Sequence, residues 1–383
     1  MDIFGGSLLA TIIPFLFVLT IVVFFHELGH FAVARWCGVK VDTFSIGFGH
    51  KLFGWRDRKG TEWKVGWLPL GGYVKFAGDE NAASLPDEEK LAEIPESEKA
   101  HYFHFKPVHQ RAAVVAAGPV ANFILAIVIF AVLFSVVGRT VATPVVDSVQ
   151  PDTPAAAAGF QPGDRVVEID GRDISSFEDM QRIVSVSGGS TLDFTVERGG
   201  TQVDLTATPE MRVVTDRFGN EHRMGMLGIV RNTGEGGVEH VRLGPLAAVG
   251  EGVDMTWFIV TQTFSYLGDI IVGSQPADQL GGPLRIAQVS GQVATLGFAA
   301  LLNLTAMLSV SIGLLNLFPV PMLDGGHLLY YGVEAARGKP LGERAQEIGF
   351  RIGLALVMSL MVFVTWNDLT QLGVFDFVGR LFS

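Results

Sequence analysis

The sequence predicts a polytopic α-helical membrane protein with four transmembrane helices, a membrane-associated β-hairpin or small sheet, and an inserted α+β domain. Of the 383 residues, 49% are hydrophobic and only 17% are charged, and the charges are missing from four long runs. An ordinary soluble domain carries about 25% charged residues. The net charge of -11 argues against a nucleic-acid partner. The single cysteine, Cys37, excludes an internal disulfide and a thiolate-rich metal cluster.

The four charge-free runs locate the predicted spans. A helix that rises 1.5 Å per residue needs about 20 apolar residues to cross a hydrocarbon core. The third run is too long for one span and contains Pro319 and Pro321, so we expect a helix from about Leu296 to Leu317 and then non-helical chain. The fourth run is short, and we extend it past Arg351. The predicted spans are 1–35, 112–138, 291–323 and 345–367.

The positions of Lys and Arg predict the orientation, because these residues concentrate in cytoplasmic loops. Twelve of them lie between residues 35 and 111, and four lie between residues 337 and 351. We therefore expect both stretches to be cytoplasmic. The inserted domain (139–232), the segment 233–290 and both termini, including the tail 368–383, are then expected on the opposite side.

Three connecting regions carry their own patterns. Residues 36–78 alternate in a strand-like way and interleave aromatic with basic residues, which suits a hairpin against the bilayer, although a small cytoplasmic hairpin fits equally well. Residues 79–111 are predicted to be a solvated acidic cytoplasmic linker. Segment 233–290 is predicted to be amphipathic at the outer membrane face, with a soluble helix packed on the inserted domain as the alternative. Residues 324–344 are predicted to be a cytoplasmic loop.

The inserted domain shows a recognisable order of elements. Thr153 is placed to cap a short helix with Pro154 at its first position, and Gly159 stops that helix. A strand, a helix over 177–186 and two strands around a Gly-Gly turn follow. This order resembles a bacterial PDZ domain, circularly permuted relative to the animal form. The resemblance implies capture of peptide C-termini by strand addition, with a carboxylate-binding loop at Leu227, Gly228 and Ile229.

The first span ends in the sequence His26-Glu27-Leu28-Gly29-His30. Residues i and i+4 of a helix share one face, so both imidazoles can reach one ion, and zinc accepts such ligands. Glu27 is then a candidate base for a water molecule at the metal. The alternative is a pair of interfacial histidines with Glu27 reaching toward water. A carboxylate at the end of a span marks function by default.

Asp324 is the candidate third ligand, since it ends the third charge-free run after the two prolines. Non-helical backbone at membrane depth is tolerated only inside protein or beside a watery cavity. The predicted orientation brings the ends of the first and third spans to the same side, so the histidines and Asp324 can hold one zinc ion per chain. His327 is a rival ligand. A helix breaker that faces the cytoplasm is the alternative role for Asp324.

Together these motifs resemble the site-2 protease family of intramembrane zinc metalloproteases, and most closely its bacterial regulator-of-sigma-E protease branch. The H-E-x-x-H motif and an N-x-x-P-x-P-x-L-D-G motif that starts at Asn316 are both unbroken, and residues 118–122 are similar to the family's G-x-x-x-N element. The resemblance implies zinc at His26, His30 and Asp324, with Glu27 as the base. Asn316 and Asn122 are implied in substrate binding. Only one PDZ domain is present, which leaves open how substrate entry is gated.

The resemblance further implies cleavage of a single-pass membrane protein, either an anti-sigma factor already cut by another protease or a remnant signal peptide. The expected setting is the inner membrane of a bacterium, in regulated intramembrane proteolysis and stress response, with a periplasmic PDZ domain and an active site toward the cytoplasm. The bilayer itself is a further expected partner. A non-catalytic PDZ scaffold or receptor is the first rival, although it needs no base at Glu27. An ion or proton transporter is the second, although it predicts charged pairs in several spans.

Overall fold

A computed structural model describes residues 8–79, 91, 93–215, 221–231, 238–273 and 281–371. The chain divides into two compact units. We call residues 1–133 with 245–383 the helical unit and residues 134–244 the inserted unit, and each is described by itself.

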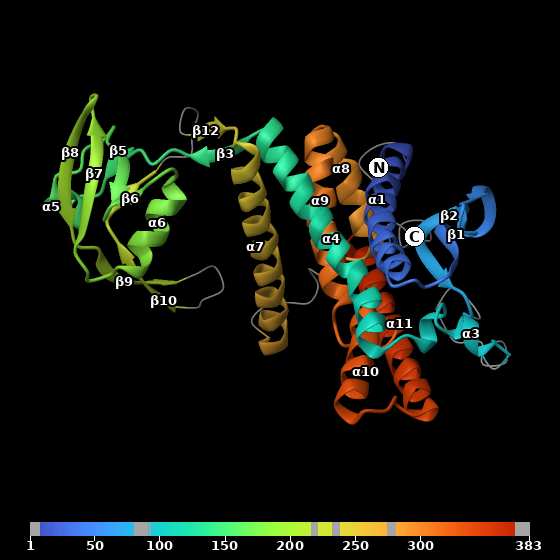
Figure 1. Ribbon diagram of the computed structural model, residues 1–383. Helices are drawn as coiled ribbons and strands as arrows, with labels where there is room; N and C mark the ends of the chain where they lie inside the picture. The colour runs from blue at the N-terminus through green and yellow to red at the C-terminus, as the bar shows by residue number, and fades with distance from the viewer. Residues whose placement is uncertain are drawn as a thin grey trace, which may run out of the picture. The chain divides into compact units, whose positions relative to one another are not determined.

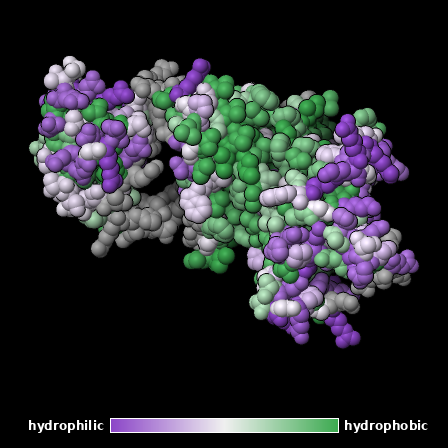
Figure 2. Space-filling model, in the orientation of Figure 1, coloured by the Kyte–Doolittle hydropathy of each residue, from purple (hydrophilic) through white to green (hydrophobic). Residues whose placement is uncertain are grey.

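Four helices of the helical unit are long and apolar enough to cross a membrane, as predicted: α1 (Leu8–Trp36), α4 (Val108–Val136), α9 (Phe298–Asn316) and α11 (Glu343–Gln371). The 19 residues of α9 extend over about 28 Å. α1, α4 and α9 lie side by side in Figure 1. Figure 2 shows hydrophobic residues over this bundle and hydrophilic residues around α10 and α3. Residues 317–323 are non-helical, as predicted, but the predicted span 291–323 starts too early, because residues 291–294 belong to the preceding helix.

The segment 233–290 contributes the helices α7 (Pro245–Val272) and α8 (Pro283–Ala294). α7 packs on α9, and its Gly252 lies against the backbone of Ile127 in α4. Residues 80–90 and 92 of the predicted acidic linker lie outside the described residues, and α3 (Glu96–Lys99) and the 3-10 helix η1 (Phe103–Phe105) belong to its described part.

The segment 324–344, predicted as a cytoplasmic loop with the third ligand, contains a helix that the sequence analysis does not predict, α10 (Asp324–Arg337), and its side of the membrane stays a prediction. Asp324 stands in the first turn and Arg337 in the last turn, which suits the helix dipole. Gly338 ends the helix in a left-handed conformation with φ 70°. α10 places Asp324 at its N-terminus.

The predicted strands of the 36–78 region are β1 (Val41–Arg56) and β2 (Glu62–Phe76). Residues 43–46 of β1 pair with residues 72–75 on one side and with residues 62–65 on the other. The two long strands therefore fold into a curled sheet of four segments, in the order 72–76, 41–48, 62–68 and 51–56. Gly47 and Gly49 take positive φ values of 81° and 82°, which β1 needs to bend. Segment 72–76 is one edge of this sheet.

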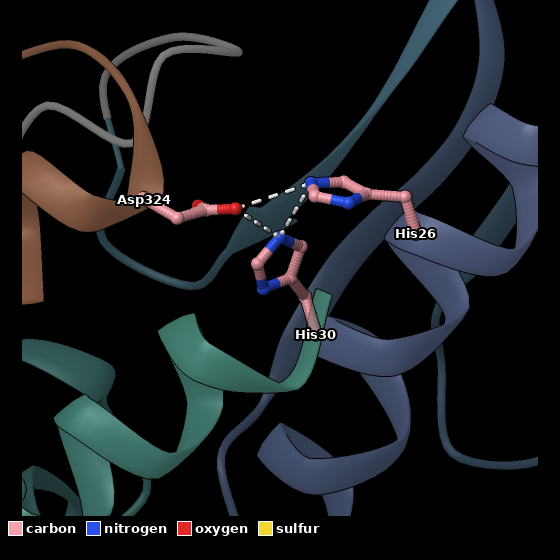
Figure 3. A group of neighbouring side chains, drawn as sticks. All are labelled: His26, His30 and Asp324. Carbon is pink, nitrogen blue, oxygen red and sulfur yellow. Dashed lines mark hydrogen bonds and ion pairs between the residues drawn. The ribbon is translucent and has the colours of Figure 1, made fainter. Parts of the chain in front are cut away.

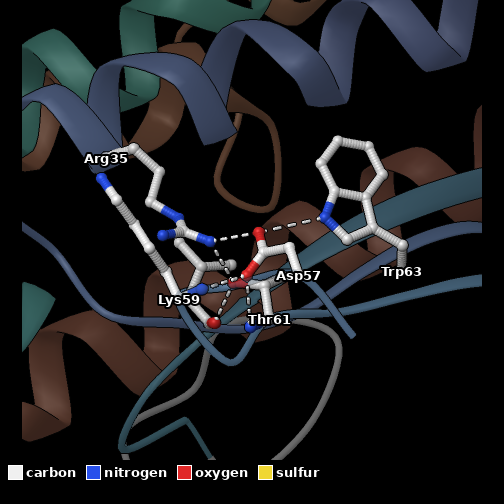
Figure 4. Close-up of polar contacts among 6 residues, drawn as sticks. Arg35, Asp57, Lys59, Thr61 and Trp63 are labelled. Carbon is white, nitrogen blue, oxygen red and sulfur yellow. Dashed lines mark hydrogen bonds and ion pairs between the residues drawn. The ribbon is translucent and has the colours of Figure 1, made fainter. Parts of the chain in front are cut away.

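A polar cluster fixes the curled sheet to α1 (Figure 4). The Arg35 guanidinium, at the end of α1, donates to Asp57 Oδ2 and Thr61 Oγ1, both at 2.6 Å. Asp57 Oδ1 accepts the N–H groups of Lys59 at 2.9 Å and Thr61 at 3.0 Å, which closes the turn between the strands. Because Arg35 is on the helix that carries the histidine motif, the sheet is held in place relative to that motif.

The inserted unit is an α+β domain with a four-stranded sheet in the order β6-β5-β7-β8. Its strands are β3 (Arg139–Ala142), β4 (Ser148–Val149), β5 (Arg165–Ile169), β6 (Arg172–Asp173), β7 (Leu192–Arg198), β8 (Thr201–Ala207), β9 (Glu210–Thr215), β10 (Glu221–Met226), β11 (Ile229–Val230) and β12 (Val238–Val241), and its helices are α5 (Pro154–Ala158) and α6 (Phe177–Val186). Residues from both helices and the sheet form one core around Phe194 and Ile169.

The two predicted helices of this unit are present, with one difference at α5. Gly159 ends α5 with φ 85°, as predicted. Thr153 precedes the helix, but its side chain does not cap it, because the hydroxyl donates to the carbonyl of Gln150 at 2.6 Å.

Candidate active site

His26 and His30 lie one turn apart on α1, and Asp324 reaches them from the start of α10 (Figure 3). The Nε2 atoms of the two histidines are 3.2 Å apart. Asp324 Oδ2 is 3.2 Å from His26 Nε2 and 3.6 Å from His30 Nε2. Among the described residues, these three form a group whose ligand atoms all lie within 4.8 Å of one another. Residues nearly 300 positions apart in the chain thus converge on one point.

Two observations show that this group fits a metal ion. His30 Nδ1 is 2.9 Å from the carbonyl oxygen of Val114 in α4, which holds the proton on Nδ1 and leaves the Nε2 lone pair directed at the group. Asp324 Oδ2 is buried, and although it lies close to both Nε2 atoms it accepts no hydrogen bond in the described part of the chain. Two imidazole nitrogens and one carboxylate oxygen are a donor set of catalytic zinc, which keeps a fourth position open.

Helix α4 supports both histidines. Gly118 and Asn122 are four residues apart and face His30 and His26 respectively. A Cβ atom at Gly118 would lie 2.3 Å from His30 Nε2, so only glycine allows α4 this close.

Asn122 is fully buried, with Nδ2 3.3 Å from His26 Nδ1, and its Oδ1 is buried without a partner among the described residues. Turning the amide by 180° gives His26 Nδ1–H an acceptor, which is what a histidine that binds metal through Nε2 requires. The structure thus places Asn122 beside a candidate ligand, and its predicted part in substrate binding stays a prediction.

The chain between α9 and α10 turns Asp324 inward. Cβ atoms at Gly325 and Gly326 would lie 2.2 Å and 2.4 Å from main-chain carbonyl oxygens, so the pair of glycines permits a tight approach. His327 lies in the same helix but is not part of the converging group. Burial lowers the pKa of His327, which favours its neutral form. The rival assignment of His327 as a ligand stays a prediction without support from this geometry.

A cavity of about 400 Å³ opens beside the group, and α1, β2, α4 and α10 contribute to its wall. Glu27 lies in it, and the backbone N–H of Val74 in β2 hydrogen-bonds to the Glu27 carboxylate. A Cβ atom at Gly72 would lie 3.0 Å from Glu27 Cγ, so β2 passes directly over the candidate base. Asn316, at the end of α9, also lines the cavity.

The predicted carboxylate loop lies in the inserted unit. The Leu227 side chain is buried in the core of that unit, and its carbonyl accepts the N–H of Ala155 at 2.9 Å. The Gly228 carbonyl accepts the N–H of Gln150 at 2.9 Å, and Ile229 pairs with Val149. With the Leu227 side chain in the core, any contact of Leu227 with a peptide falls to its main chain, and the predicted role of this loop in peptide binding stays a prediction.

The ligand group, the adjacent carboxylate and the cavity define a metal-dependent peptidase. The model of Peptidase family M50 matches residues 14–360, and the chain belongs to this family. The chain is 52% identical to a candidate zinc metalloprotease of Agrobacterium fabrum over 96% of its own length and 97% of that protein. It is 44% identical to metalloprotease MmpA of Caulobacter vibrioides, over 98% and 99% of the two chains.

Membership in this family makes the protein a zinc metalloprotease, which confirms the predicted enzyme class and cofactor and disfavours both the scaffold and the transporter. With four helices apolar enough to cross a membrane, it is a multi-pass membrane protein. Among solved structures, the chain is similar to the PDZ domain of the SdrC-like protein of Listeria innocua, with 24% identity over 23% of this chain and 91% of that chain and a TM-score of 0.19.

Proposed function

We propose that this zinc metalloprotease hydrolyses a peptide bond within or near the transmembrane segment of single-pass membrane proteins. The observation that carries the proposal is that His26, Glu27 and His30 all lie on α1, a helix long and apolar enough to cross a membrane. A site built on such a helix is within reach of a chain in the bilayer. The proposed substrates are an anti-sigma factor or a remnant signal peptide, already cut by another protease, in regulated intramembrane proteolysis at a bacterial inner membrane.

The proposed orientation follows the basic residues of the sequence. The site faces the cytoplasm, and the inserted unit and both termini are periplasmic. The inserted unit is proposed to bind peptide C-termini through its loop at 227–229.

The residues of the site divide the chemistry. Bound at His26, His30 and Asp324, zinc supplies a Lewis acid that polarises the substrate carbonyl and lowers the pKa of water to about 7. The Glu27 carboxylate, beside the ligands, accepts the proton of the attacking water and returns it to the leaving amide nitrogen. The Asn316 side chain, which lines the cavity, is proposed to hold the substrate strand or the developing oxyanion. The three ligands, being held by α1, α4 and α10, need little rearrangement.

A transmembrane substrate presents a mechanical problem, because a helix uses its own amide groups and shields the peptide bond. We propose that edge segment 72–76 of the curled sheet binds the unwound substrate by strand addition. This segment passes over Glu27, and Gly72, Tyr73 and Val74 line the cavity. Gly72 lets this edge lie close to α1, because a Cβ atom there would be 2.9 Å from Val23 Cγ1 and 3.0 Å from Glu27 Cγ.

A proline substitution tests strand addition, because proline removes a main-chain donor. We expect Gly72→Pro to cleave a model transmembrane substrate at least tenfold more slowly than Gly72→Ala, which adds the same Cβ atom but keeps the N–H donor, while zinc content stays at one per chain. The control is Leu52→Pro in segment 51–56, at the opposite edge of the sheet, where proline is tolerated on an edge strand. Equal cleavage by Gly72→Ala and Gly72→Pro would refute strand addition.

A further inference from the structure

Edge segment 72–76 has a closed end. The Phe76 N–H donates to Asp79 Oδ2 at 3.0 Å, and the Phe76 carbonyl accepts the backbone N–H of Asp79 at 3.2 Å. Main-chain groups two residues apart in a strand point to the same side. Since the Val74 N–H points at Glu27, the groups of Phe76 belong to the same cavity side of the edge. Asp79 therefore occupies both groups that an added strand would use at Phe76.

Asp79 is itself held firmly. Its side chain is fully buried, and its Oδ1 is 2.9 Å from His104 Nε2. The neighbouring Phe103 stacks on Phe76 with ring centroids 4.7 Å apart, which fixes η1 against the end of the strand. A buried carboxylate is costly unless it is hydrogen-bonded, and this one has partners at both oxygens. His104 also lines the cavity, so the closed end belongs to its wall.

We propose that Asp79, supported by His104, is a stop that sets the register of the substrate strand and so selects the bond that is cut. This inference rests on the proposed function, in which segment 72–76 binds the substrate. A substrate strand can pair with the main-chain groups of Gly72 and with the carbonyl of Val74, whose N–H is bonded to Glu27, but it must leave the edge at Phe76. The distance from this stop to the zinc ligands then determines which peptide bond lies at the metal.

Removing the stop has a defined consequence. A slip of one residue turns every side chain to the other face, so a strand slips by two residues to keep its faces. Two residues correspond to about 7 Å along the strand, which carries the original bond away from the metal and brings a new one to it. Without the stop, a second product is therefore expected, cut two residues from the original bond.

The experiment maps the cleaved bonds by mass spectrometry, with the full chain and one model transmembrane substrate. We expect a single bond in wild type, and for Asp79→Ala at least one fifth of the product cut at a bond displaced by two residues. Asp79→Asn keeps an oxygen that accepts the Phe76 N–H, so we expect the original bond. Glu96→Ala is the control, because Glu96 is an exposed acid of the same segment.

Zinc content and thermal unfolding are measured for each variant. If Asp79→Ala does not fold, His104→Leu removes the support of the stop, and a displaced product is expected again. If every folded variant at position 79 or 104 cuts only the original bond, the proposal is overturned, whatever the rate of cleavage. A wild-type protein that leaves the substrate uncut would instead overturn the proposed function.

Discussion

Gly118→Ala tests the packing of α4 against the metal ligands. A methyl group at Gly118 would lie 2.3 Å from His30 Nε2 and 2.9 Å from His26 Cε1, whereas ordinary contact begins at 3.4 Å. The His30 ring must therefore move by about 1.1 Å, and metal–ligand distances tolerate only about 0.2 Å. We expect His30 to leave the site. The resulting loss of zinc affinity should exceed the roughly 10- to 100-fold effect of removing an outer partner of a ligand.

The assay measures zinc per chain and zinc affinity by competition with a chelator, together with cleavage of the model substrate. Overpacking alone costs about 1–3 kcal/mol, so thermal unfolding is followed as well. Gly332→Ala is the matched control, because a Cβ atom there has nothing within 4 Å. This variant is expected to retain zinc, and its free energy of unfolding should rise by about 0.5–1 kcal/mol, because alanine is more stable than glycine inside a helix. Wild-type zinc affinity in Gly118→Ala would refute the geometry.

Three further predictions concern separate parts of the molecule. Asn122→Leu removes the amide beside His26, so zinc affinity should fall about 10- to 100-fold in chelator competition, and an unchanged affinity would contradict the positioning role. Gly72→Val presses a side chain against Val23 and Glu27, so kcat should fall while zinc stays bound; a normal rate would show that β2 does not set the position of Glu27. In the inserted unit, burial raises the pKa of Asp164, but the two hydrogen bonds from the Arg198 guanidinium outweigh it and lower the pKa below its usual value of 3.8. A carboxylate with a lowered pKa in the folded state stabilises the fold at pH values above its usual pKa, and this stabilisation is lost on acidification. The free energy of unfolding, measured by circular dichroism, should therefore fall below about pH 4. Arg198→Met should show a flatter dependence on pH.

The local and compositional features were predictable from the sequence. The i, i+4 spacing of His26 and His30 follows from helix geometry alone, and the charge-free runs gave the four long helices. Asp324 was found because it is a charge at the end of such a run. The helix α10 is not predicted although its signals are present, since Arg337 in its last turn is interpreted only as a marker of a cytoplasmic loop.

Other features depend on contacts that leave no sequence signal. The curled sheet arises because residues 43–46 pair on both sides, which alternation along one strand does not encode. The carbonyl of Val114 orients His30, yet every residue has a carbonyl, so nothing marks Val114 in the sequence. The sequence marks Gly118 only as part of a motif. Glycine is required at this position because α4 lies close to His30, and this contact leaves no signal in the sequence.

The central claim is that Glu27 acts as the base beside a zinc ion held by His26, His30 and Asp324. The most direct measurement is zinc content and cleavage of a model transmembrane substrate by wild type and Glu27→Gln. The claim predicts one zinc per chain in both proteins and a loss of cleavage in Glu27→Gln of at least about 100-fold, the scale of general acid–base catalysis. Undiminished cleavage by Glu27→Gln would contradict the role of the base, and wild-type protein that binds no zinc would contradict the site.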